Sequence, residues 1–81
     1  MAFVYLLLEQ YDKVIEDFTK SIELNPDYAE PYFLRGYAYH NLGQYEEAIN
    51  NYDKALGINP NHPQAMPRRT QLLEEHPELK P

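Results

Sequence analysis

Apolar residues follow a helical spacing in two stretches of the chain. In the second stretch they recur every three or four positions, at Tyr45, Ala48, Ile49, Tyr52, Ala55 and Leu56. The matching positions of the first stretch are Tyr11, Val14, Ile15, Phe18, Ser21 and Ile22. Residues three and four apart share one side of an α-helix. The pattern therefore predicts two amphipathic helices, and no stretch alternates with period two for long enough to indicate a strand.

Prolines and glycine mark the predicted helix ends. The pairs Asn25–Pro26 and Asn59–Pro60 each close an apolar stretch. The residue before a proline is disfavoured in the α region, so we expect both helices to end there. A further helix is predicted from Pro31 to Leu42, because proline suits a first helical turn. Gly43 is free to adopt the left-handed conformation that ends such a helix.

The sequence repeats with a fixed period, which equals the separation of Pro26 and Pro60. A shift by this period places residues 11–28 on residues 45–62, with apolar positions falling on apolar positions. Identical pairs include Tyr11 with Tyr45, Ile15 with Ile49 and Lys20 with Lys54. A fixed period of this length is typical of a solenoid of stacked helical repeats.

Residues 29–62 resemble one complete tetratricopeptide repeat, a helix–turn–helix unit of about 34 residues. The positions that carry the resemblance, and that we expect to pack between helices, are Tyr32, Gly36, Tyr39, Ala48, Tyr52, Ala55 and Pro60. Arg35 replaces the family's usual leucine, so we expect its stem to pack and its charged end to reach solvent. The resemblance implies an all-α fold in which antiparallel helix–turn–helix repeats stack as a short right-handed superhelix.

The register of the repeat divides the chain into three parts. Residues 1–28 form a truncated first repeat, with part of its first helix and a complete second helix, and residues 29–62 form the complete repeat. Residues 63–81 are a degenerate capping helix and tail. We expect this last helix to begin near Pro67, because Met66 before it is disfavoured as helical. A solenoid usually needs roughly three repeats for stability, and this chain has fewer. We therefore expect a partner to cover the apolar surface that missing repeats would otherwise bury.

Composition and charge narrow the function classes. The chain has 81 residues and no cysteine, which excludes disulfides and thiolate chemistry. Its formal net charge of −6 argues against nucleic acid and anionic membrane surfaces as partners. The apolar run Ala2–Leu8 is too short to span a bilayer and lacks the features of a signal peptide. We therefore expect a cytoplasmic protein without membrane insertion.

No group of residues indicates catalysis or cofactor binding. His40, His62 and His76 are widely spaced, and none has a second ligand at helical spacing, so we interpret them as solvent or groove histidines. The adjacent acids Glu46–Glu47 and Glu74–Glu75 point to different sides of a helix and cannot act as a carboxylate pair. The sequence therefore predicts no enzyme, no cofactor and no metal site.

The resemblance implies a concave groove lined by the first helix of each repeat. Carried onto this chain, the groove positions are Glu30, Phe33, Leu34, Tyr37, His40, Asn41 and Arg68. Phe33, Leu34 and Tyr37 form an apolar patch, which fits a bound ligand and a buried contact with a neighbouring repeat equally well. A clamp for a partner's terminal carboxylate is not predicted, because Leu34 and Gln64 replace its asparagine and lysine.

The leading hypothesis is a non-catalytic module that binds a peptide or helix of another protein in this groove. The alternative is a self-assembling scaffold unit whose repeats stack or exchange helices between copies. Its candidate contacts are Phe3, Val4, Leu6 and Leu7, in a stretch that is apolar all round. Glu9 stands where a turn glycine is expected, so residues 2–24 could run as one long helix and exchange.

Overall fold

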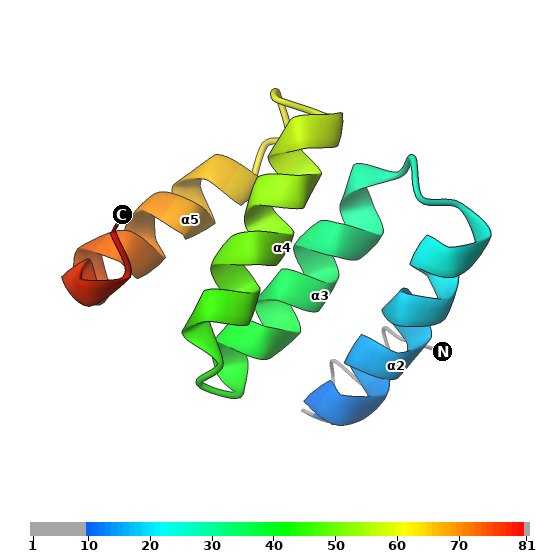
Figure 1. Ribbon diagram of the computed structural model, residues 1–81, viewed down its shortest axis with the longest axis horizontal. Coiled ribbons are helices and arrows are strands. Elements are labelled where there is room, and N and C mark those ends of the chain that lie inside the picture. Colours follow the sequence, from blue (N-terminus) through cyan, green and yellow to red (C-terminus); the bar gives the residue numbers. More distant parts are fainter. Residues whose placement is uncertain (1–9, 81) are drawn as a thin grey trace.

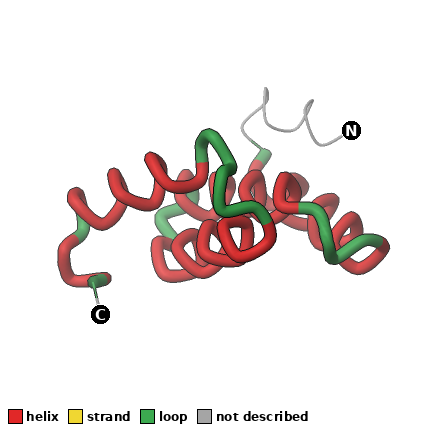
Figure 2. Tube along the Cα trace, turned by 90° about the horizontal axis from the view of Figure 1, so that it is seen from above, coloured by secondary structure: helices red, strands yellow, loops and turns green. Residues whose placement is uncertain are grey.

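The computed structural model describes residues 10–80, and all regular structure in that range is helical. The elements are α2 (Tyr11–Leu24), α3 (Ala29–Asn41), α4 (Tyr45–Ile58), α5 (Ala65–Glu75) and the 3₁₀ helix η1 (Pro77–Leu79). Consecutive helices lie antiparallel and side by side in one row (Figure 1). Seen from above, α2 and α5 lie at opposite ends of that row (Figure 2). The predicted all-α helical solenoid is confirmed.

The repeat in the sequence is also a repeat in the backbone. Helices α2 and α4 begin and end at positions that are one repeat period apart. Gln10 (φ −91°, ψ 72°) and Gln44 (φ −92°, ψ 75°) precede them in nearly the same conformation. At the other end the side-chain oxygens of Asn25 and Asn59 accept backbone N–H bonds two residues on, at 3.3 and 3.1 Å. The predicted helix ends before both prolines are therefore confirmed.

A single helix over residues 2–24 does not form, because the chain leaves the helical conformation at Gln10. The carbonyl of Gln10 accepts the N–H groups of Lys13 and Val14, both at 3.2 Å, and so begins α2 there. The prediction of one continuous helix over residues 2–24 was wrong, whereas exchange of helices between copies stays a prediction. The proposed self-association residues Phe3, Val4, Leu6 and Leu7 lie outside the residues that the structure describes.

Gly43 ends α3 as predicted. It adopts φ 80°, a conformation that L side chains rarely reach. Its N–H bonds to the carbonyl of His40 at 3.1 Å, and the N–H of Gln44 bonds to the carbonyl of Tyr39 at 2.9 Å. These two bonds are the Schellman pattern, which satisfies the last carbonyls of a helix.

Helix α5 begins at Ala65, two residues earlier than predicted. Pro67 therefore lies in the first turn, where a helical N–H has no intrahelical partner and its loss costs no bond. The imidazole of His62 supplies the missing cap, because its Nδ1 accepts the N–H groups of Gln64 and Ala65, both at 3.2 Å. The bonds from His62 stabilise the first turn of α5. Met66 therefore lies in the helix, although a residue before a proline is disfavoured in the α region.

The core lies between α3, α4 and α5. Its buried members are Ala29, Phe33, Ala48, Tyr52, Ala55, Ala65 and Leu72. Tyr32 and Tyr39 are partly buried against it. At Gly36 a β-carbon would lie 2.8 Å from Cε1 of Tyr52, so the missing side chain is what allows the tyrosine ring to lie against α3. Pro60, in contrast, is exposed in its turn and does not pack between helices.

Arg35 joins three helices. The prediction that its charged end reaches solvent was wrong, because the guanidinium is bonded to neighbouring helices. Its Nε donates to Oδ1 of Asn51 on α4 at 2.7 Å, and its Nη1 donates to Oγ1 of Thr19 on α2 at 3.2 Å. The guanidinium also lies 5.6 Å from the ring centroid of Tyr32. Asn51 is buried and accepts this bond from the guanidinium. Helical spacing along the sequence did not indicate that Asn51 would be the partner of Arg35.

Candidate partner-binding surface

The predicted groove residues of α3 divide into exposed and covered side chains. Glu30 and Asn41 are exposed, whereas Leu34, Tyr37 and His40 are half-buried. Asn41 donates its amide to the carbonyl of Tyr37 at 2.8 Å, and its amide oxygen accepts no hydrogen bond from residues 10–80. These five side chains thus form a mixed apolar and polar surface along the helix.

Phe33 belongs to the core and is not available to a ligand at this surface. Only 2% of its surface is exposed. Its ring centroid lies 5.6 Å from that of Tyr52 and 4.8 Å from that of His62. Phe33 is covered within its own repeat by α4 and the turn before α5, so its contacts are neither with a ligand nor with the neighbouring repeat that the sequence suggested.

Arg68 and Tyr37 meet across two repeats. The guanidinium carbon of Arg68 on α5 lies 5.2 Å from the ring centroid of Tyr37 on α3, within the range of a cation–π contact. Within residues 10–80, Arg68 has no ion pair, whereas Arg69 pairs with Asp53. Two residues that the sequence placed in the groove therefore stand together, and the guanidinium keeps its hydrogen-bond donors.

Tyr52 holds a buried hydroxyl without a hydrogen-bond partner in the described residues. Burial raises the pKa of this hydroxyl to about 12, and the charge of Arg68 opposes the rise. An orphaned buried polar group costs free energy. The unpartnered hydroxyl of Tyr52 therefore lowers the free energy of unfolding that the buried ring would otherwise provide.

His62 is buried, contrary to its interpretation as a solvent or groove histidine. It is 6% exposed, and its Nε2 lies 2.9 Å from Oε2 of Glu30 on α3. Because Nδ1 accepts two backbone N–H groups, Nε2 carries the proton and donates to the carboxylate. No local sequence signal marks this role, since the carboxylate comes from 32 residues away.

A second aromatic group gathers where the α3–α4 turn meets the end of α5. The ring of His40 meets Tyr45 edge-on at 5.8 Å, and Tyr45 stacks on His76 at 3.9 Å. Burial lowers the pKa of His40, and the charges of Arg68 and His76 lower it further against the raising effect of Glu75. His40 is therefore neutral at pH 7 and presents an uncharged ring.

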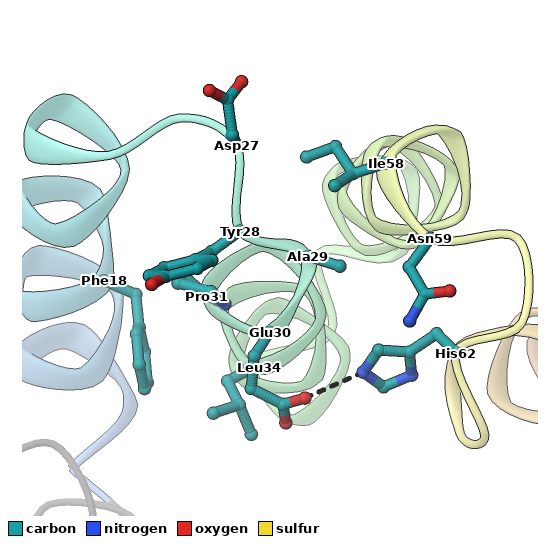
Figure 3. Close-up of a pocket in the computed structure, with 10 residues that line it drawn as sticks. All are labelled: Phe18, Asp27, Tyr28, Ala29, Glu30, Pro31, Leu34, Ile58, Asn59 and His62. Carbon is teal, nitrogen blue, oxygen red and sulfur yellow. Dashed lines mark hydrogen bonds and ion pairs between the residues drawn. The ribbon is translucent and has the colours of Figure 1, made fainter.

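A cavity of about 560 Å³ opens at the N-terminal end of α3. Its lining residues are Phe18, Asp27, Tyr28, Ala29, Glu30, Pro31, Leu34, Ile58, Asn59 and His62. Phe18 of α2 and Tyr28 of the loop lie on one side, and Asn59 and His62 lie on the other (Figure 3). Only Glu30 and Leu34 among them were predicted as groove residues.

No group of three histidine, cysteine, aspartate or glutamate side chains that could hold a metal ion occurs in residues 10–80. None of the helices in that part of the chain combines the length and apolar character needed to cross a membrane.

A row of antiparallel helices with a fixed sequence period defines a helical-repeat protein. A family model described as tetratricopeptide repeat matches residues 29–62, and one described as TPR repeat matches residues 4–43. The chain belongs to the tetratricopeptide-repeat family, whose members are non-catalytic interaction modules.

Solved structures with the same fold include proteins named MamA. A crystal structure of MamA superposes with a TM-score of 0.88 at 24% identity, over 96% of this chain and 45% of that one. A mutant of MamA superposes with a TM-score of 0.81 at 30% identity, over 96% of this chain and 44% of that one. The chain thus spans less than half the length of these proteins. A search of curated proteins found no match.

Proposed function

We propose that the chain binds a peptide or helix of another protein along the exposed side of α3 and has no catalytic activity of its own. The single observation that carries this proposal is the contact of Tyr37 with Arg68. This contact brings an aromatic ring and a guanidinium to one surface. The guanidinium has no ion pair within the described residues. Tyrosine and arginine are the side chains that most often dominate binding energy at protein interfaces.

The neighbouring groups suit an extended or helical ligand. Leu34 offers an apolar contact, Asn41 offers an amide oxygen, and Glu30 offers an exposed carboxylate oxygen beside its bond to His62. His40 adds a neutral ring at the far end of the same helix. The surface therefore supports apolar anchoring with polar contacts around it.

A selection of random peptides displayed on phage tests this proposal. Enriched peptides are synthesised with a fluorescent label and titrated against the chain and its Tyr37→Ala variant. We expect the variant to bind about tenfold more weakly, which is the loss of one hot-spot contact. Met66→Ala is the matched control, because Met66 is 49% exposed on α5. Equal binding by Tyr37→Ala and the parent chain would overturn the proposal.

Self-assembly is the second candidate function, and exposed apolar side chains favour it. Leu24 is 87% exposed and Tyr28 is 63% exposed, at the end of α2 and in the loop after it. Burial of such groups against another copy would be favourable. Sedimentation at micromolar concentration and melting at several concentrations test this candidate. The mass of a single chain at every concentration would exclude it.

A further inference from the structure

Two contacts connect α3 with α5 and the turn before it, and they bring groups of opposite charge to the same side of α3. At the start of α3, Oε2 of Glu30 lies 2.9 Å from Nε2 of His62. About two helical turns later, the ring of Tyr37 lies beside the guanidinium of Arg68. The exposed side of α3 therefore has a negative end at Glu30 and a positive end at Arg68.

Glu30 is an exposed carboxylate that a buried histidine holds in place. The side chain of His62 is 5% exposed, whereas that of Glu30 is 60% exposed. Nδ1 of His62 accepts two backbone N–H groups at the start of α5, which fixes the ring and directs its Nε2–H to Glu30. Figure 3 shows the other carboxylate oxygen pointing away from the imidazole. This oxygen can accept a hydrogen bond from a ligand at a fixed position.

The charge of Glu30 is not neutralised by a cation of the described residues. Within residues 10–80, Glu30 forms no ion pair with a lysine or arginine, and its contact is with His62. The imidazole is uncharged in this arrangement, because its Nδ1 accepts hydrogen bonds. The lining of the adjacent cavity includes Asp27 and contains no lysine or arginine, and the chain carries a net charge of −6. The surroundings of Glu30 therefore favour a positively charged ligand group.

We propose that Glu30 binds a lysine or arginine side chain of the partner, and that His62 is the positioning residue that holds the carboxylate for this contact. The inference rests on the proposed function, because it names the chemistry of the ligand at the same surface. Arg68 repels a cation at the Tyr37 end, so the two charges also fix where along α3 the basic residue lies.

The geometry of α3 sets the spacing within the ligand. Glu30 and Tyr37 are seven residues apart, which is about 10 Å along the helix axis. In an extended ligand the basic residue therefore lies about three positions from the residue that contacts Tyr37. In a helical ligand it lies about seven positions away.

Glu47 provides a matched control for Glu30. An acidic residue in the first turn stabilises a helix by itself. Glu47 has this place in α4 as Glu30 has it in α3, and both are exposed. Glu30→Gln and Glu47→Gln therefore remove the same charge from the same part of a helix. The new amide oxygen at position 30 can still accept the N–H of His62, so the melting curves of the two variants should lie close together.

Phage-displayed random peptides are selected in parallel against the parent chain, Glu30→Gln and Glu47→Gln. We expect lysine or arginine at one fixed position in peptides from the parent and from Glu47→Gln, and no such preference with Glu30→Gln. An enriched peptide and a version with glutamine in place of its basic residue are then titrated against each chain. The basic residue should strengthen binding about fivefold with the parent and with Glu47→Gln, but less than about twofold with Glu30→Gln.

Glu30→Asp tests the role of His62. This variant keeps the negative charge, but its side chain is one methylene group shorter, so the carboxylate loses the position that His62 gives it. We expect the basic peptide to bind about threefold more weakly than to the parent chain. The imidazole ¹⁵N resonances of His62, followed by NMR, should shift in the free variant. Binding equal to that of the parent would overturn the positioning role.

Other results would overturn the contact itself. Peptides that depend on Tyr37 but bind equally to the parent and Glu30→Gln, with or without a basic residue, would refute the contact and leave the proposed function standing. An equal loss of binding in Glu30→Gln and Glu47→Gln would assign the preference to the net charge of the chain. Failure to enrich any peptide on the parent chain would overturn the proposed function and this inference with it.

Discussion

Gly36 and Gly57 both lie inside helices, but they have opposite surroundings. A β-carbon at Gly36 would come within 2.8 Å of the Tyr52 ring, whereas one at Gly57 would meet nothing within 4 Å. We expect Gly36→Ala to lower the free energy of unfolding by about 1–3 kcal/mol through overpacking. Gly57→Ala should raise it by about 0.5–1 kcal/mol, because alanine restricts the unfolded chain and favours helix. Urea denaturation measures the free energy of unfolding of both variants. A lower value for Gly57→Ala than for the parent chain would contradict this prediction.

The buried hydroxyl of Tyr52 predicts a sensitivity to alkaline pH. Its pKa is raised to about 12 in the folded chain, whereas the ordinary value in an unfolded chain is 10.0. The unfolded state therefore releases this proton first, and stability falls as the pH rises from about 10 to about 12. We expect this residue to account for a loss of about 1.4 kcal/mol by pH 11.

Tyr52→Phe is the matched variant for this prediction, because it removes the hydroxyl and keeps the ring. At pH 7 its free energy of unfolding should equal that of the parent chain or exceed it by about 1 kcal/mol, since no hydrogen bond is lost. Between pH 9 and pH 11 it should lose less stability than the parent. Denaturation curves with parallel pH dependence for the two chains would show that Tyr52 titrates normally.

At the scale of helices, arginines connect neighbouring repeats at the same offset. Arg35 on α3 bonds to Thr19 on α2, and Arg69 on α5 bonds to Asp53 on α4, each across 16 residues. The first link also includes the buried Asn51. Helix α5 thus docks through an arginine as α3 does, although its sequence is otherwise degenerate.

Replacement of Arg35 by the family's usual leucine tests this link. We expect Arg35→Leu to lower the free energy of unfolding by about 1–3 kcal/mol, because Asn51 then loses a partner for its buried oxygen. Asp53→Ala should cost at most about 1 kcal/mol, since Asp53 and Arg69 form a more exposed pair. A double-mutant cycle of Arg35→Leu with Thr19→Ala would give zero coupling if the two side chains do not interact.

Across the whole molecule, the centre of the row should be more stable than the C-terminal end. Helices α3 and α4 contact each other and supply most buried core residues, whereas α5 contacts α4 and η1. In a solenoid, stability is close to a sum over neighbouring interfaces. We expect the amides of α3 and α4 to exchange about tenfold or more slowly than those of α5 under native conditions. Uniform protection in all described helices would instead indicate one cooperative unit.

Part of the site was predictable at the level of the element but not of the side chain. The resemblance to the tetratricopeptide repeat placed Leu34, Tyr37 and Arg68 in one groove, and the structure brings the latter two into contact. The same resemblance placed Phe33 beside them, although α4 covers it. A one-dimensional pattern gives the angle of a side chain around its helix. It does not give the position of the next helix, which decides how wide the covered sector is.

The repeat period could be read directly from the order of residues along the chain. The helix ends at Asn25 and Asn59 and the turn at Gly43 were predictable too, because they depend on backbone preferences within a few residues. The cap that His62 provides for α5, the bonds of Arg35 across three helices and the burial of Phe33 follow from how the helices pack against one another. The partners of Arg35 and His62 lie 16 to 32 residues away in the sequence. The cavity beside Tyr28 likewise could not be predicted from the sequence, because it exists only where the packed helices leave space between them.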